Sequence, residues 1–165
     1  LFMKCSFLAP LALSLLLAGC ATTALKPAST QAVNFTVVSP LTRTSDAGFM
    51  RKFKNQTEVQ IYASGISVLS LVLKGDKICM NGACDDELVF NKKFFGAEHY
   101  RGLLGEILDG KPIFGGSDTG GHCFEQSLQD GSIDYKVCRD KDGGGRSISF
   151  ADAKRGVKIK IRELQ

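Results

Sequence analysis

The sequence predicts an α+β fold in which one curved, half-open antiparallel β-sheet packs against one main amphipathic helix. Three observations favour this fold class. Short segments of alternating apolar residues recur with turn signals between them, which is typical of antiparallel strands. Residues 94–108 switch to helical spacing of their apolar residues. Glycine is frequent, with 18 residues, and proline is rare, with 4, which suits tight hairpin turns.

Length and charge limit the domain organisation. The chain has 165 residues and divides by composition into residues 1–19, a signal peptide, residues 20–32, a flexible tether, and residues 33–165, a single α+β domain. The net charge of +4 is small, and no basic stripe with interleaved aromatic residues appears. We therefore expect no nucleic-acid partner.

The apolar run near the N-terminus predicts export. Lys4 precedes an almost wholly apolar segment, Phe7–Leu17, which is shorter than the ~20 residues that span a bilayer and fits a secretory signal. The run closes on Leu17-Ala18-Gly19-Cys20. This tetrapeptide resembles the lipobox of bacterial lipoproteins, which implies that Leu1–Gly19 is removed and that the Cys20 thiol is acylated. A plain signal peptide, or an uncleaved helix with a chance cysteine, is the alternative.

Acylation of Cys20 implies a membrane partner and a location. Two or more acyl chains anchor a protein stably. In the sorting rules that the lipoprotein resemblance implies, an Asp after the cysteine favours the inner membrane, whereas Ala21 follows it here. We therefore expect a lipid anchor in the outer membrane, facing the periplasm, with the cell surface as the alternative.

Four further cysteines predict two disulfides in an oxidising compartment: Cys79, Cys84, Cys123 and Cys138. The dipeptide Asn81-Gly82 predicts a type I′ hairpin turn, which places Cys79 opposite Cys84 in a non-hydrogen-bonded pair. Asp130-Gly131 predicts a second such turn and places Cys123 opposite Cys138, by strict counting in a hydrogen-bonded pair. A four-cysteine metal site is the alternative, but these spacings are unusual for zinc, so we expect no metal.

Alternating segments predict the strands. These are Val33–Val38, Glu58–Ala63, Ile66–Leu73, Lys77–Met80, the hairpin Phe124–Val137, Ser147–Phe150 and Val157–Arg162. Ile66–Leu73 is apolar on both faces, which predicts burial on both sides or a strand that lines a lipid-like cavity. Residues 42–55 fit a short helix or a loop. The one expected helix is Phe94–Leu108, in which Gly102 and Gly105 each cost about 1 kcal/mol relative to Ala.

This layout resembles the outer-membrane lipoprotein acceptor LolB and its soluble relative LolA, unclosed barrels whose helix-covered apolar concavity holds acyl chains. The resemblance rests on the lipobox, the strand pair Val59–Leu73, the pattern Leu103-Leu104-x-x-Ile107-Leu108-x-Gly110-x-Pro112, and the alternation of Val157–Ile161. It implies binding of lipids or lipoproteins in a concavity lined by Leu69, Leu71, Leu73, Leu103, Leu104 and Ile107. An ordinary filled core is the alternative for these six residues.

No group of residues predicts an enzyme or a cofactor. Asp118-Thr119-Gly120 resembles the catalytic triplet of aspartic proteases, but it lies in a polar glycine loop, and those enzymes need two aspartates that share a proton. His99 and His122 fit no metal-binding framework. The acidic cluster Asp85-Asp86-Glu87 favours a solvated edge over a calcium site. The alternative function is a non-enzymatic structural or assembly lipoprotein of an envelope complex, which binds protein through an exposed strand edge.

Overall fold

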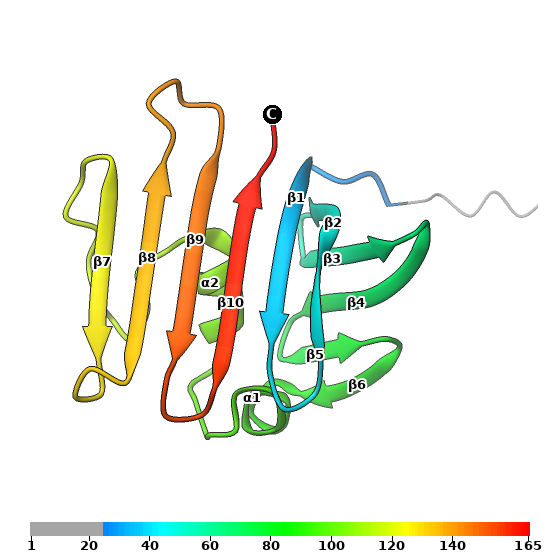
Figure 1. Cartoon of the computed structure of the whole chain (residues 1–165). Coiled ribbons are helices and arrows are strands. Elements are labelled where there is room, and N and C mark those ends of the chain that lie inside the picture. The colour runs from blue at the N-terminus through cyan, green and yellow to red at the C-terminus, as the bar shows by residue number, and fades with distance from the viewer. Residues whose placement is uncertain (1–24) are drawn as a thin grey trace, which may run out of the picture.

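A computed structural model describes residues 25–165, which fold into one ten-stranded antiparallel sheet and two short helices (Figure 1). The strands are β1 (Ser29–Val38), β2 (Arg43–Lys52), β3 (Gln56–Ala63), β4 (Ile66–Lys74), β5 (Lys77–Met80), β6 (Ala83–Asp86), β7 (Cys123–Leu128), β8 (Ile133–Arg139), β9 (Arg146–Asp152) and β10 (Val157–Glu163). The predicted signal peptide, Leu1–Gly19, and Cys20 lie outside the described residues.

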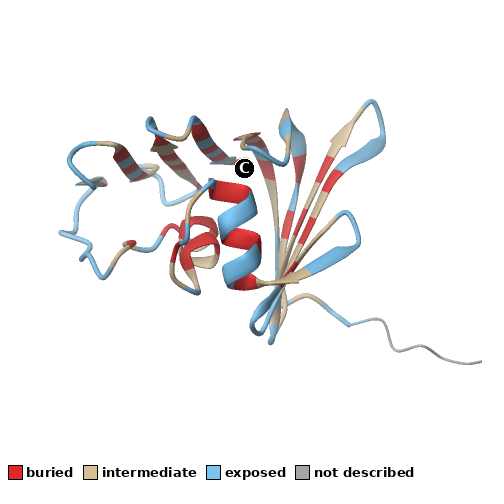
Figure 2. Cartoon of the chain, turned by 90° about the horizontal axis from the view of Figure 1, so that it is seen from below, coloured by how far each residue is buried: buried red, intermediate tan, exposed pale blue. Residues whose placement is uncertain are grey.

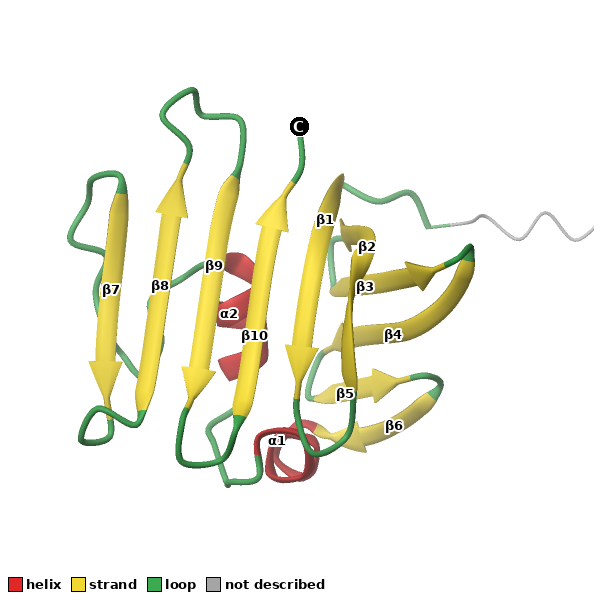
Figure 3. Cartoon of the chain, in the orientation of Figure 1, coloured by secondary structure: helices red, strands yellow, loops and turns green. Residues whose placement is uncertain are grey.

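The sheet is open, with β6 and β7 as its edges. The strand order is β6-β5-β4-β3-β2-β1-β10-β9-β8-β7, so the first and last strands pair at the centre. Hairpins join all neighbouring strands except β1 and β10, and the helices connect the two edges. The sheet bends strongly between β1 and β3, and both helices lie inside the bend (Figures 1 and 3). The predicted curved, half-open antiparallel sheet is therefore confirmed.

The prediction of one helix over Phe94–Leu108 is wrong. The structure has α1 (Glu87–Phe95) and α2 (Leu103–Asp109). Gly96, at φ 69°, ends α1, and Gly102, at φ 94°, precedes α2. These left-handed conformations are favourable for glycine and interrupt a helix. The periodic apolar residues therefore belong to two helices, and the fold is mostly β, so that α+β describes it only approximately.

Figure 2 shows buried residues on the strands and on the sides of both helices that face them. α1 contacts β5 and β6, and α2 contacts β9. The core combines residues of both arms of the sheet with those of the helices, including Val59, Phe95, Leu104, Val137 and Ile159, all with 0% exposure. Burial of this apolar surface is the main stabilising contribution that holds the bend closed around the helices. No helix within residues 25–165 is long and apolar enough to cross a membrane.

Three strand predictions differ from the structure. β1 begins at Ser29, within the predicted tether 20–32, because Ala28 N donates to Lys52 O (2.7 Å) and the strand continues the pairing with β2. Residues 43–52 form β2 rather than a helix or loop. β4 is buried on one face only, since Ile66 is 70% and Val68 38% exposed. The apolar pattern does not predict the start of β1 or the extent of β2, because both segments are polar. Backbone pairing between β1 and β2, rather than apolar alternation, extends these strands.

Both predicted disulfides are present, between Cys79 and Cys84 and between Cys123 and Cys138. Asn81 (φ 49°) and Gly82 (φ 87°) form the first hairpin turn. The expected phase of the second hairpin is wrong, because Arg139 N donates to His122 O (2.8 Å) and the Cα atoms of Cys123 and Cys138 are 4.1 Å apart. These are signs of a non-hydrogen-bonded cysteine pair. The shift originates at the turn, where Gln129 also adopts a positive φ of 52°.

Candidate functional site

Five of the six residues expected to line a concavity lie in the core. Leu69 and Leu71 of β4 and all three α2 residues, Leu103, Leu104 and Ile107, have 0% exposure. Leu73, near the end of β4, is half-buried and packs against this core. Side chains therefore occupy the space between α2 and the centre of the sheet, and open space begins at Leu73.

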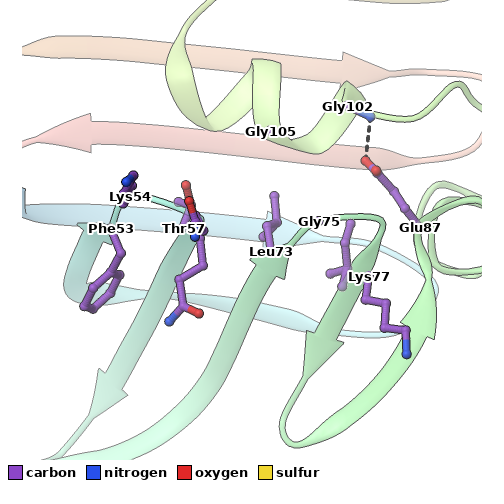
Figure 4. Close-up of a pocket in the computed structure, with 12 residues that line it drawn as sticks. Phe53, Lys54, Thr57, Leu73, Gly75, Lys77, Glu87, Gly102 and Gly105 are labelled. Atoms are coloured by element: carbon purple, nitrogen blue, oxygen red, sulfur yellow. Dashed lines mark hydrogen bonds between the residues drawn. The ribbon is translucent and has the colours of Figure 1, made fainter. Parts of the chain in front are cut away.

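A pocket of about 290 Å³ opens beside Leu73, between α2 and the ends of strands β3–β5 (Figure 4). Its lining residues come from the β2–β3 turn, the β4–β5 turn and the starts of both helices: Phe53, Lys54, Asn55, Gln56, Thr57, Leu73, Gly75, Lys77, Ile78, Glu87, Gly102 and Gly105. Figure 4 shows Leu73 and Thr57 directed from the strands toward α2. The pocket lies at the low end of the ~300–1,000 Å³ range of small-molecule sites.

Gly105 gives the pocket its space on the helix side. This residue lies inside α2 and has no positive φ, so its conformation does not require glycine. A Cβ added to Gly105 would meet only Leu73 Cδ2, at 3.9 Å, so close packing does not require glycine either. A glycine inside a helix costs about 1 kcal/mol relative to Ala. Its local effect is therefore to leave a methyl-sized space beside Leu73 at the wall of the pocket.

Glu87 is the buried polar group of the pocket. It is the first residue of α1 and only 7% exposed. Its Oε1 accepts a hydrogen bond from Gly102 N at 2.6 Å, which connects α1 to the start of α2. The expectation of a solvated acidic edge is thus wrong for this residue. Its neighbour Asp86 caps α1 by accepting from Leu88 N at 3.0 Å, and Asp85 pairs with Lys93.

Charged contacts fix both ends of α2 relative to the sheet. At its C-terminal end, Asp109 pairs with Lys52 of β2 and with Lys111. Burial alone would raise the pKa of Asp109, but hydrogen bonds from these two lysines outweigh it and hold the pKa below its usual value. Before its N-terminal end, Arg101 pairs with Asp86 at 2.9 Å. The position of Gly105 over the pocket is therefore set from both sides.

Half-buried Tyr100 and buried His99 make polar and aromatic contacts on another side of α2. Tyr100 donates its hydroxyl hydrogen to Glu106 and accepts a hydrogen bond from Phe114 N at 2.8 Å. Burial, together with the Glu106 contact, raises the pKa of Tyr100. His99 is 7% exposed between the rings of Phe95 and Phe114, and its Nε2 has no hydrogen-bond partner within the described residues. These contacts hold the segment before α2 against the helix.

The other candidate residues do not converge on a reaction centre. Asp118 lies in the loop before β7, pairs with Arg139 at 2.5 Å and accepts from Gly120 N at 2.9 Å. The Arg139 contact lowers the pKa of Asp118. His99 is buried, whereas His122 is exposed. Between residues 25 and 165, no three His, Cys, Asp or Glu side chains gather as metal ligands would.

Sequence reasoning singled out Gly105 and Leu73 but missed Glu87 as a pocket residue. One signal could have located it: Asp86 followed by Glu87 and the apolar residues 88–90 is typical of a helix start. No protein-family model matches this chain, and a search of curated proteins found no significant match. The fold and pocket define a curved, open antiparallel sheet that holds helices in its concavity, with a small cleft beside α2.

Proposed function

We propose that this chain is a membrane-anchored lipoprotein of the bacterial envelope, acylated on Cys20, that binds lipid or the acyl chain of another lipoprotein beside α2, in the manner of LolB. The observation that carries the proposal is the pocket of about 290 Å³ that Leu73 and Gly105 help to line, at the rim of a helix-filled concavity. Its position agrees with the resemblance, which places ligands between the helices and the unclosed barrel. Its size suits one alkyl chain better than several.

The ligand proposal is tested by native mass spectrometry of a chain that starts at Ala21. All described pairings and buried residues lie within residues 25–165, so this chain keeps the whole described sheet and core. It is purified from bacterial periplasm, as such and as Gly105→Leu, in which the longer side chain fills the pocket. A co-purifying lipid-sized mass that is lost in Gly105→Leu supports the proposal. Bare protein that takes up no added acyl peptide contradicts it.

The anchor is tested separately with the full chain. Labelled palmitate is supplied to bacteria that express the protein or its Cys20→Ser variant, and the membrane and soluble fractions are compared. The proposal expects label and membrane attachment only with Cys20. Equal attachment of both forms would contradict acylation of Cys20 without affecting the pocket.

The free edge at β7 favours a second function, assembly with a partner protein. The phase of the β7–β8 pairing directs the main-chain N–H and C=O groups of Cys123, Glu125 and Ser127 away from β8. β7 contains no Lys and no Pro, residues that usually protect an edge. An added strand from a partner is therefore the alternative to lipid binding.

Two variants at one position test this alternative. Glu125→Pro removes an outward N–H group, a change that an edge strand tolerates, whereas Glu125→Ala keeps that group and also loses the contact with Lys136. The measurement is cross-linking of each variant to partner proteins in the bacterial envelope. Cross-links that are lost in Glu125→Pro but retained in Glu125→Ala would support strand addition. Equal cross-linking of both variants would exclude the β7 edge as the contact.

A further inference from the structure

We propose that the pocket beside α2 selects an amphiphile with a primary ammonium head, held by Glu87, and a single alkyl chain that lies along Leu73. This inference rests on the proposed lipid-binding function and adds the chemistry of the head group. The head group lies at the end of the pocket formed by the starts of α1 and α2, where Glu87 accepts a hydrogen bond from Gly102 N.

Among the residues that line the pocket, Glu87 is the one that carries a carboxylate. It is 7% exposed and lines the pocket. Its Oε1 is occupied by Gly102 N, at 2.6 Å, and no ion pair to Glu87 occurs within residues 25–165. The nearby guanidinium of Arg101 binds Asp86 and Asp76 O instead. The other oxygen, Oε2, has no hydrogen-bond partner within the described residues and is not sealed off from solvent, so a donor that enters the pocket can reach it. A charged donor forms the strongest such hydrogen bond.

The other side chains are distributed unevenly along the pocket. Figure 4 shows Glu87 and Lys54 toward opposite ends, with Leu73 and Thr57 between them, while Lys77 points away from α2. The middle of the pocket therefore offers Leu73 and the bare backbone of Gly105 to an alkyl chain. An ammonium group fits the Glu87 end. An anionic head would have to reverse this orientation and bind at Lys54.

The volume of the pocket limits the size of its ligand. The volume of about 290 Å³ is at the low end for small-molecule sites. It accommodates one chain of moderate length with a compact head. A primary ammonium group is compact and donates three hydrogen bonds, whereas a quaternary ammonium group donates none. We therefore expect the head group to be a primary amine, such as an alkylamine or an amine-bearing single-chain lipid.

The test compares three probes with the same chain and different heads: decylammonium, decanol and decanoate. Isothermal titration calorimetry measures their binding to the chain from Ala21, below the micellar concentrations. We expect decylammonium to bind with one-to-one stoichiometry and about tenfold more tightly than decanoate, as a charge-assisted hydrogen bond implies. Equal affinities, or tighter binding of decanoate, would overturn the ammonium assignment.

Two matched variants locate the effect. Glu87→Gln keeps an oxygen for Gly102 N but removes the charge, and Glu125→Gln removes one charge from the distant edge strand β7. Glu87→Gln should abolish the tenfold preference and leave decanol binding intact, which also shows that the variant is folded. Glu125→Gln should preserve the preference. An unchanged preference in Glu87→Gln would overturn the role of this residue.

The outcomes separate this inference from the function on which it rests. If all three probes bind without a preference, the pocket binds chains but Glu87 does not select the head. If no probe binds, and Gly105→Leu behaves as the parent chain does, the lipid-binding proposal fails and the head-group inference fails with it.

Discussion

Lys52 of β2 and Asp109 at the end of α2 form an ion pair in which both side chains are largely buried, at 33% and 25% exposure. At the other end of α2, the backbone of Gly102 is held by Glu87. Between these two contacts, the one atom that a Cβ on Gly105 would meet is Leu73 Cδ2, at 3.9 Å. Polar contacts at the two ends of this short helix thus set the distance between Gly105 and Leu73.

Replacing Asp109 with Asn should lower the free energy of unfolding by about 1 kcal/mol at pH 7, a typical value for a partly buried charged contact. The pKa of Asp109 is lowered in the folded state, so the pair stabilises the fold above the unfolded-state pKa of ~4, and this contribution is lost as the pH falls through the folded-state pKa. Urea unfolding of both proteins at pH 7 and pH 3 measures it. An equal difference at both pH values would contradict the assignment.

His99 should give the fold a second pH dependence, in a different range. Burial and the nearby Arg155 lower the pKa of His99, outweighing the opposite effect of Asp152. The unfolded chain therefore takes up a proton near pH 6.5 that the folded chain does not, and the stability should decrease as the pH falls from about 7 to 5. His99→Phe, which keeps an aromatic ring between Phe95 and Phe114 but cannot take up a proton, should flatten this dependence in thermal unfolding.

The exposed histidine provides the control for this experiment. His122→Gln should leave the slope between pH 7 and pH 5 as it is in the parent chain. If His122→Gln removes the slope and His99→Phe does not, the titration of His99 is not its cause.

The sequence predicted the sheet and its cysteines well because these depend on local signals. Asn81-Gly82 sets a hairpin register by turn geometry alone, and that register brings Cys79 to Cys84. The helix was harder to predict, because residues 94–108 have helical periodicity, whereas residues 96–102, with left-handed glycines at both ends of the stretch, separate α1 from α2. The spacing of apolar residues along the chain does not reveal an interruption of the helix that depends on tertiary packing.

The site was predictable only in part, for a similar reason. The alternation of β4 identifies Leu69, Leu71 and Leu73 as one face, but it does not show which of these residues the core encloses completely. Leu69 and Leu71 are fully buried, whereas Leu73 is half-buried and lines the pocket. Glu87 was missed because its burial depends on Gly102, fifteen residues away in the sequence.

Gly105→Ala should stabilise the protein by about 1 kcal/mol, since Ala is the better helix former and the new methyl group meets only Leu73 at van der Waals distance. Gly48→Ala is the contrasting variant, because its Cβ would lie 2.0 Å from Gln60 O and the strands β2 and β3 would have to separate. Urea unfolding of both variants measures the difference. Destabilisation by Gly105→Ala would show that the space opposite Leu73 is closed in solution.

The two disulfides should contribute unequally to stability. Cys123 and Cys138 are 15 residues apart and Cys79 and Cys84 only 5. In the chain-entropy description, the longer loop restricts the unfolded chain more, so replacing the first pair by Ser should lower the free energy of unfolding by about 3 kcal/mol and replacing the second by about 2 kcal/mol. The double-serine variants are compared by urea unfolding without reductant. A larger loss from the Cys79–Cys84 pair would show that this bond has a structural role at the β5–β6 edge beyond restriction of the unfolded chain, since it lies directly before the Asp86 cap of α1.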